Sequence, residues 1–307
     1  MAAEDISQNH GTGQISCNLD VNHQMPEVIG TIAAVRSRIS AVRKDSEVKM
    51  GFVPTMGFFH EGHLSLMRAA RSECDFVVVS VYVNPAQFEP TEDIDAYPRD
   101  FDRDLSLAGS EGIDLVFAPG DDEIYPDGHE TVVVPGSVAG DLCGRSRPGH
   151  FSGVATVVNK FFNVIQPEIA YFGQKDAQQA AVIKRMVADL NIPVEVRVCP
   201  TVRESDGLAK SSRNSYLSVE ERAAAPALYQ ALVAARQAVE AGKTDAAAIK
   251  RLMRRTIGQN YLVEFEYARV VDPETMKAVK IIDGPVLAAV AGKVGQARLI
   301  DNLIIQP

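Results

Sequence analysis

The sequence predicts an α/β domain built on a parallel sheet, followed by a smaller α+β domain. Residues 48–53 form a short apolar run, residues 64–71 carry apolar side chains at helical spacing, and residues 76–83 are apolar and β-branched. A strand, a helix and a second strand in this order make the parallel crossover unit of an open sheet. After residue 200, helical patterns precede strand patterns, which is typical of an α+β unit. We expect a flexible leader at 1–24, the α/β domain at 25–200 and the small domain at 201–307.

The other elements of the first domain follow from periodicity. Apolar residues from Val28 to Val42 fit one face of a helix, and the helix after the first strand extends to about Glu73. Mixed charges at 97–108 predict an exposed helix, and the apolar stretch 154–165 predicts a buried one. Further strands are expected at 113–117, 169–172 and 194–199.

The second domain begins with helix signals. Ser218 to Glu221 has the form of a capping box, and Pro226 interrupts the alanine-rich stretch that follows. A second amphipathic helix is expected at 244–257, and strands at 262–271, 286–291 and 297–305. A small domain of this kind could serve as a lid.

Composition excludes several classes of protein. The chain has 307 residues and a formal net charge of −9, so it has no basic excess for binding nucleic acid. Its four cysteines form no CxxC pair, which argues against a zinc cluster and favours a reduced, cytoplasmic compartment. Neither a secretory signal nor a membrane-spanning run is visible, so no membrane partner is expected.

The stretch from Pro54 to His63, PTMGFFHEGH, is the strongest functional signal. It lies between a predicted strand and a predicted helix, where unpaired backbone N–H groups and a partial positive charge favour phosphate. His60 and His63 add two imidazole donors, and Gly57 and Gly62 let the backbone approach a ligand closely. The alternative is a loop whose histidines are merely partly buried.

Two other strand ends carry polar side chains at the same sheet edge. Asn84 and Gln87 follow the second strand, where ordinary turn chemistry is the alternative explanation. Gly173 to Asp176 follows a later strand and includes Lys175, and a solvated charged turn would explain it equally well. Ligands of open α/β sheets bind at the carboxyl ends of strands, which favours a functional interpretation.

Two loops add positive charge. The stretch 140–153 contains Arg145, Arg147 and His150, and the stretch 201–213 ends in Lys210-Ser-Ser-Arg213. The second loop is polar and poor in apolar anchors, so we expect it to be mobile and to close over a ligand. Neither the P-loop nor the GxGxxG pattern is present. An HxGH turn combined with a lysine–serine loop indicates nucleotidyl transfer.

Five motifs in order resemble the pantoate–β-alanine ligases: PTMGFFHEGH, VSVYVNPAQF, RPGHFSGVATVV, YFGQKDAQQ and RESDGLAKSSRNSYLS. The resemblance covers the chain from about Val28 onward. It implies a Rossmann-like nucleotidyltransferase domain, similar to class I aminoacyl-tRNA synthetases. It also implies ATP-dependent condensation of D-pantoate with β-alanine to pantothenate, through a pantoyl adenylate and with release of AMP and pyrophosphate. ATP as co-substrate, Mg²⁺ and a homodimer are implied as well.

The resemblance assigns roles to individual residues. Catalytic roles are implied for His60, His63, Lys175, Ser211, Ser212 and Arg213, with His63 as a proton donor. Contacts to ATP are implied for Pro54, Thr55, Met56, Gly57, Phe58, Phe59, His60, Glu61, Gly62, His63, Gly173, Gln174, Lys175, Asp176, Val202, Lys210, Ser211, Ser212 and Arg213. Contacts to the other substrates are expected for Asn84, Gln87, Arg147, His150 and Gln179. The protein ligands of the metal are not determined by the sequence.

The chain departs from the family pattern at three places. Gln174 stands where glutamate is common, Lys210 where methionine is common, and Phe58-Phe59 where alanine-leucine is common. We expect the Lys210 cation to tighten pyrophosphate binding. Two other functions remain open: a nucleotidyltransferase that acts on a phosphate ester, and a non-catalytic nucleotide sensor on the same fold. The paired glutamines and the lysine–serine loop argue against both.

Overall fold

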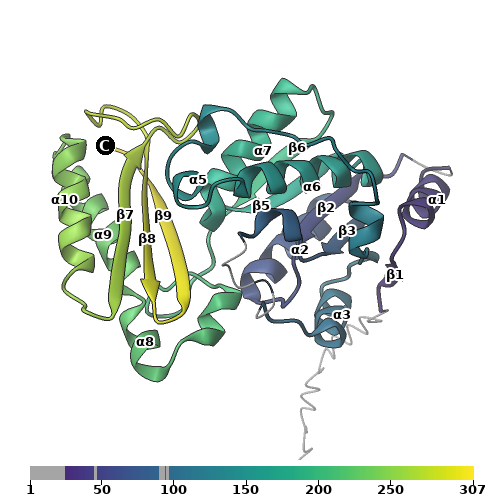
Figure 1. The fold of residues 1–307 in the computed structure, drawn as a ribbon, viewed down its shortest axis with the longest axis horizontal. Helices are drawn as coiled ribbons and strands as arrows, with labels where there is room; N and C mark the ends of the chain where they lie inside the picture. Colours follow the sequence, from purple (N-terminus) through teal and green to yellow (C-terminus); the bar gives the residue numbers. More distant parts are fainter. Residues whose placement is uncertain (1–24, 45–46, 90–93, 95–96) are drawn as a thin grey trace, which may run out of the picture.

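Two sheets organise the computed structural model, which describes residues 25–44, 47–89, 94 and 97–307. The predicted leader lies outside the described residues. A six-stranded parallel sheet forms the first domain, and a three-stranded antiparallel sheet forms the second (Figure 1). The fold class predicted from the sequence is therefore confirmed.

The parallel sheet has the strand order β1-β4-β3-β2-β5-β6. Its strands are β1 (Glu27–Ile29), β2 (Met50–Thr55), β3 (Phe76–Val81), β4 (Leu115–Phe117), β5 (Ile169–Gly173) and β6 (Glu195–Cys199). The chain proceeds from β2 to β3 on one side and from β5 to β6 on the other, so β2 and β5 flank the switch point of the sheet. Ligands of such folds bind outside the carboxyl ends of the strands at this point.

Helices cover both faces of the parallel sheet. Core residues of α1 (Ile32–Arg43), α6 (His150–Ile165) and α7 (Ala177–Asp189) pack together on one face. The opposite face is covered by α2 (Glu61–Glu73) and α3 (Phe101–Ser110). The connections also contain the short helices α4 (Asp121–Ile124) and α5 (Cys143–Ser146) and the 3₁₀ turns η1 (Pro85–Gln87), η2 (Ser137–Ala139) and η3 (Gln174–Asp176).

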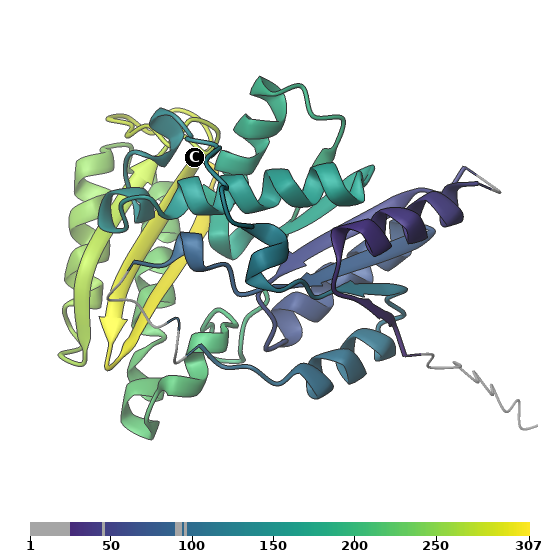
Figure 2. The ribbon, with the colours of Figure 1, turned by 45° about the vertical axis from the view of Figure 1, so that its right-hand side comes forward.

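The middle strand of the C-terminal sheet is buried on both faces. The sheet consists of β7 (Val263–Val271), β8 (Val286–Val294) and β9 (Ala297–Ile305), and it follows η4 (Ser212–Tyr216), α8 (Val219–Ala224), α9 (Ala227–Glu240) and α10 (Ala246–Ile257). Along β8, Ala288 and Val290 pack with α9 and α10, whereas Leu287 and Ala289 join the core of the first domain. Figure 2 shows this sheet at the opposite end of the molecule from β1 and α1.

The structure corrects three details of the predicted elements. Val28 belongs to β1 and not to the first helix. Gly30 separates the two elements, and the Thr31 side chain caps α1 by accepting a hydrogen bond from Ala34 N. Helix α6 begins at His150, four residues before the predicted start. The predicted exposed helix at 97–108 instead begins at Phe101, and its Asp104 is buried at 2% exposure.

Candidate functional site

A cavity of about 220 Å³ lies at the switch point of the parallel sheet. Segments that follow β2, β3, β5 and β6 line it. Among the predicted site residues, its lining includes Pro54, Thr55, Met56, His60, Gly62, His63, Asn84, Gln87, Arg147, His150, Gly173, Lys175, Asp176, Gln179, Val202, Lys210, Ser211, Ser212 and Arg213. The structure therefore brings together the histidine turn, both glutamines and the lysine–serine loop.

Five of the predicted ATP-binding residues do not line this cavity: Gly57, Phe58, Phe59, Glu61 and Gln174. The Phe59 side chain is buried in the core beneath the turn, and Glu61 forms an exposed ion pair with Arg68. Gly57 and Phe58 both adopt positive φ, of 83° and 50°, so the chain reverses here. Gly57, Phe58 and Phe59 therefore shape the turn, and His60 and His63, which follow it, line the cavity.

His60 and His63 cap the helix that they begin. His60 Nδ1 accepts a hydrogen bond from Gly62 N at 3.1 Å, and His63 Nδ1 accepts one from His60 N at 3.3 Å. The two rings stack with centroids 4.1 Å apart. Since both Nδ1 atoms accept, each neutral ring carries its proton on Nε2. Gly62 allows this arrangement, because a Cβ there would lie 2.8 Å from the His60 ring.

Both imidazoles are electrostatically biased toward the neutral form. Burial, followed by the positive charge of Lys175, lowers the pKa of His60 from 6.5 to about 4. Burial and then the neighbouring His60 hold the pKa of His63 well below its usual value. At neutral pH each ring is therefore a neutral hydrogen-bond donor through Nε2, not a cationic acid.

Asp104 fixes the turn before the histidines, and sequence reasoning missed it. Its carboxylate accepts hydrogen bonds from Phe58 N and Phe59 N, both at 2.6 Å. Neighbouring Arg103 donates to Phe59 O at 3.0 Å, and its guanidinium lies 5.4 Å from the Phe58 ring centroid. The charge pattern of 97–108 indicates only an exposed helix; an acid aimed at two backbone N–H groups far away in the sequence leaves no local signal.

Asn84 supports Gln87. Asn84 is 1% exposed; its amide nitrogen donates to Gln87 Oε1 at 3.1 Å and to Gly153 O at 3.2 Å. Tyr125 donates its hydroxyl to Asn84 Oδ1 at 2.8 Å. With its amide engaged in this way, Asn84 orients Gln87, whose amide nitrogen faces Met56 Sδ at 3.1 Å.

Arg147 and His150 hold the backbone of the same segment. Arg147 donates to His150 Nε2 at 3.1 Å and to Gln87 O at 3.2 Å. Because an arginine can only donate, His150 Nε2 accepts and its Nδ1–H donates to Gln87 O at 2.8 Å. The loop rich in glycine and arginine thus contacts the Gln87 turn directly.

The loop from 201 to 213 is ordered by contacts of its own. Lys210 Nζ lies 2.7 Å from Glu204 Oε1, and Lys210 N donates to Val202 O at 2.9 Å. Ser211 Oγ accepts from Arg213 N at 3.3 Å, and Ser212 Oγ donates to Phe58 O at 3.4 Å. The last contact joins this loop to the histidine turn, so the two predicted phosphate-binding segments meet.

Neither a metal cluster nor a membrane span is found in the part of the chain that the structure describes. Within ranges 25–44, 47–89 and 97–307, no group of three or more His, Cys, Asp or Glu is placed to hold a metal ion. Over the same ranges, no helix combines the length and the apolar character that crossing a membrane requires.

A family model, curated relatives and solved structures all resemble this chain over most of its length. The family model described as pantoate-beta-alanine ligase matches residues 27–304. The pantothenate synthetases of Caldicellulosiruptor bescii and Moorella thermoacetica are 50% and 51% identical over 91% of this chain, and each match spans 99% of the relative. The solved pantothenate synthetase of Thermus thermophilus is 46% identical with a TM-score of 0.86, covering 92% of this chain and 100% of that one. A Francisella tularensis pantoate-beta-alanine ligase, solved with β-γ ATP and β-alanine, is 33% identical with a TM-score of 0.74, covering 91% and 97%.

Proposed function

The chain belongs to the pantoate–β-alanine ligase family, and from that premise we propose how its cavity condenses D-pantoate with β-alanine. In the first step a pantoate carboxylate oxygen attacks the α-phosphorus of ATP, and the bond to pyrophosphate breaks. In the second, the β-alanine amine attacks the carbonyl carbon of the pantoyl adenylate. The bond to AMP breaks, the nitrogen loses a proton, and pantothenate is formed.

The cations and the histidine turn are assigned to the phosphates. The first step brings a carboxylate to a negative centre, so charge on the phosphates must be neutralised. We assign this role to Lys175, Lys210 and Arg213, with the hydroxyls of Ser211 and Ser212. The Nε2–H groups of His60 and His63 donate to phosphate oxygens as neutral donors at the positive end of α2. In this proposal His63 donates a hydrogen bond and does not transfer its proton.

Pantoate is assigned to the two glutamines. Gln87 and Gln179 offer neutral donors and acceptors that hold a hydroxyl and a carboxylate without adding charge near the nucleophile. Asn84, Arg147 and His150 act indirectly, since their side chains hold the Gln87 segment. The backbone of Val202 is assigned to adenine, with its N–H as the contact because its carbonyl already accepts from Lys210 N.

Mg²⁺ is assigned to the nucleotide. This ion is commonly held by one or two carboxylates together with substrate phosphates and water. Asp176 is an acid in the cavity lining and would hold the ion beside Lys175. When bound, Mg²⁺ neutralises phosphate charge.

We also propose that the enzyme is a cytoplasmic homodimer, as the family resemblance implies; sedimentation velocity tests the assembly state.

One observation carries this assignment: the donors of the histidine turn, Lys175 and the lysine–serine loop surround a single cavity. The test is ATP–pyrophosphate exchange with and without D-pantoate, followed by AMP release on addition of β-alanine. Exchange that requires pantoate, then AMP and an amide when the amine is added, is the expected result. Exchange independent of both substrates would favour another nucleotidyltransferase, and ATP binding without exchange would favour a sensor.

A further inference from the structure

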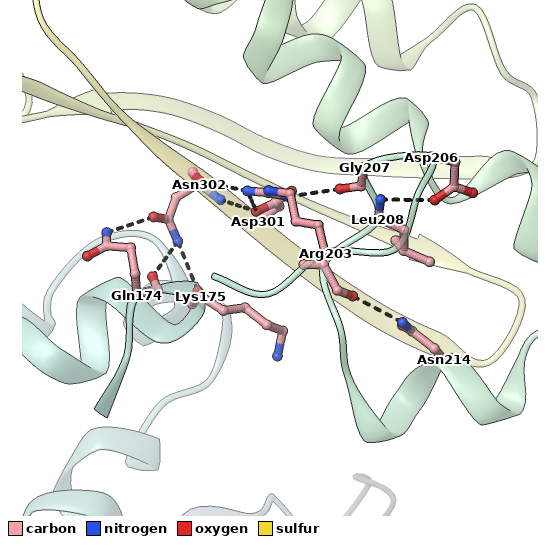
Figure 3. Close-up of polar contacts among 10 residues, drawn as sticks. Gln174, Lys175, Arg203, Asp206, Gly207, Leu208, Asn214, Asp301 and Asn302 are labelled. Atoms are coloured by element: carbon pink, nitrogen blue, oxygen red, sulfur yellow. Dashed lines mark hydrogen bonds and ion pairs between the residues drawn. The ribbon is translucent and has the colours of Figure 1, made fainter. Parts of the chain in front are cut away.

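A side chain of the C-terminal domain holds the turn that carries Lys175. Asn302 lies on β9 and is 4% exposed. Its amide nitrogen donates to Gln174 O and to Lys175 O, both at 2.9 Å, and its Oδ1 accepts from Gln174 Nε2 at 2.9 Å (Figure 3). Both N–H donors and the oxygen of this amide therefore bind Gln174 and Lys175, two consecutive residues of η3.

The strand itself holds Asn302 in place. Asn302 pairs with Ala289 of β8, the middle strand of the C-terminal sheet, and its N–H donates to Asp301 Oδ1 at 2.7 Å. Asp301 in turn accepts two hydrogen bonds from Arg203, at 2.6 and 2.9 Å, and Arg203 also donates to Asn302 O at 3.3 Å (Figure 3). The amide therefore projects from a support that also anchors the base of the 201–213 loop.

We propose that Asn302 is a positioning residue for the adenylation step. It sets the location of Lys175 relative to the phosphates through two main-chain carbonyls, and it makes no contact of its own with substrate. The proposal rests on the function proposed above, because it takes Lys175 as the cation that neutralises pyrophosphate. It goes further in assigning a residue of the small domain to the first chemical step only.

The two half-reactions separate this role from a merely structural one. Once pyrophosphate has left, attack of the β-alanine amine on the adenylate no longer needs the Lys175 charge. A residue that positions Lys175 therefore affects adenylation and leaves aminolysis unchanged. A residue that only joins the two domains would affect both steps, because both take place in the same cavity.

The experiment compares Asn302→Ala with the wild-type enzyme in both half-reactions. We expect pantoate-dependent ATP–pyrophosphate exchange to fall about tenfold to a hundredfold, the scale of a small misplacement of a catalytic group. Aminolysis of preformed pantoyl adenylate in a single turnover should keep its wild-type rate. A parallel fall in both reactions, or no fall in exchange, would overturn the proposal.

Two further variants make the outcome unambiguous. Gln174→Met removes only the hydrogen bond to Asn302 Oδ1, and it tests the same proposal if Asn302→Ala fails to fold. We expect a smaller fall in the rate of ATP–pyrophosphate exchange and no change in aminolysis. An unchanged exchange rate counts against the proposal. Asn260→Ala is the matched control, since Asn260 caps a turn of the same domain by accepting from Leu262 N at 3.1 Å. Absence of exchange in the wild-type enzyme would refute the proposed function instead.

Discussion

The carboxylate of Asp104 accepts a hydrogen bond from the backbone N–H of Phe58 at 2.6 Å, across 46 positions of the sequence. Phe58 has a positive φ of 50°, a conformation that a bulky residue adopts only when its surroundings enforce it. The hydrogen bonds to Asp104 therefore help to hold the backbone of the turn before His60 in this conformation. Burial raises the pKa of this carboxyl, and the hydrogen bonds from Phe59 N and Phe58 N oppose that rise.

Replacing Asp104 with asparagine should destabilise the protein. An amide can accept only one of the two N–H groups well, and it turns its own donor toward the other, so the free energy of unfolding should drop by about 1–3 kcal/mol. Urea denaturation measures this change. Asp102→Asn is the control, because Asp102 is exposed on the same helix; equal stabilities of the two variants would contradict the role of Asp104.

His63→Ala should reduce turnover by about two orders of magnitude, the usual effect of removing one positioned donor. The expected cause is loss of the Nε2–H donor to the phosphates. Steady-state AMP release measures the effect. His129→Ala is the control, since His129 contacts the Tyr125 ring and does not line the cavity. An unchanged rate for His63→Ala would remove this residue from the mechanism.

His60 in the histidine turn should make the free energy of unfolding decrease as the pH falls below 6.5. The pKa of His60 is about 4 in the folded protein and 6.5 when unperturbed, so between these values the unfolded chain binds more protons. This contribution is fully present above pH 6.5 and is lost as the pH falls toward 4. Side-chain NMR titration of His60 measures its pKa directly; a midpoint near 6.5 would show that the ring is not desolvated as described.

Arg203→Leu should cost about 3–5 kcal/mol of stability, because it leaves Asp301 buried without its partner. Asp301 is 4% exposed, and the pair is 2.6 Å apart at its closest atoms. The matched control is Arg222→Leu, which breaks a partly exposed pair with Asp206 and should cost about 0–1 kcal/mol. Denaturation of both variants tests the difference, and similar costs would refute it.

Lys210→Met removes the ammonium of the lysine–serine loop and should weaken ATP binding severalfold without abolishing turnover. The Lys210 ammonium is held by Glu204, so part of its charge is already compensated before ATP arrives. Glu204→Gln should therefore tighten ATP binding, more strongly at low salt. Isothermal titration calorimetry at two ionic strengths measures both changes. If Glu204→Gln weakens binding, the ion pair orders the loop and does not compete with phosphate.

Much of the site could be predicted because its parts follow strand ends. The apolar runs of β2, β3 and β5 mark central strands, and the parallel crossover rule places the residues after them on one edge. Those runs place the histidine turn, Gln87 and Lys175 at a common edge, and the cavity lining includes all three. Family membership, expected from five motifs, is confirmed. The individual roles of these residues remain predictions.

The parts that escaped prediction depend on contacts between distant segments. Asp104 and Asn302 each bind backbone groups more than 40 positions away, and no periodicity or local motif records such a contact. The polar composition of the 201–213 loop predicts mobility, yet Arg203 ties its base to β9 and stacks on the Tyr229 ring at 4.2 Å. Periodicity assigns Val28 to a helix because the three residues of β1 are too few for an alternating pattern to emerge.

In the proposed function, the histidine turn uses the same two side chains for architecture and for chemistry. Nδ1 of each ring caps the start of α2, and both histidines line the cavity to which we assign the phosphates. A replacement at either position must therefore supply two groups at a fixed separation. One is an acceptor for a backbone N–H, and the other is a donor directed into the cavity. Asparagine could meet the first demand alone and alanine neither. An imidazole can meet both because its two nitrogens point in different directions from one rigid ring.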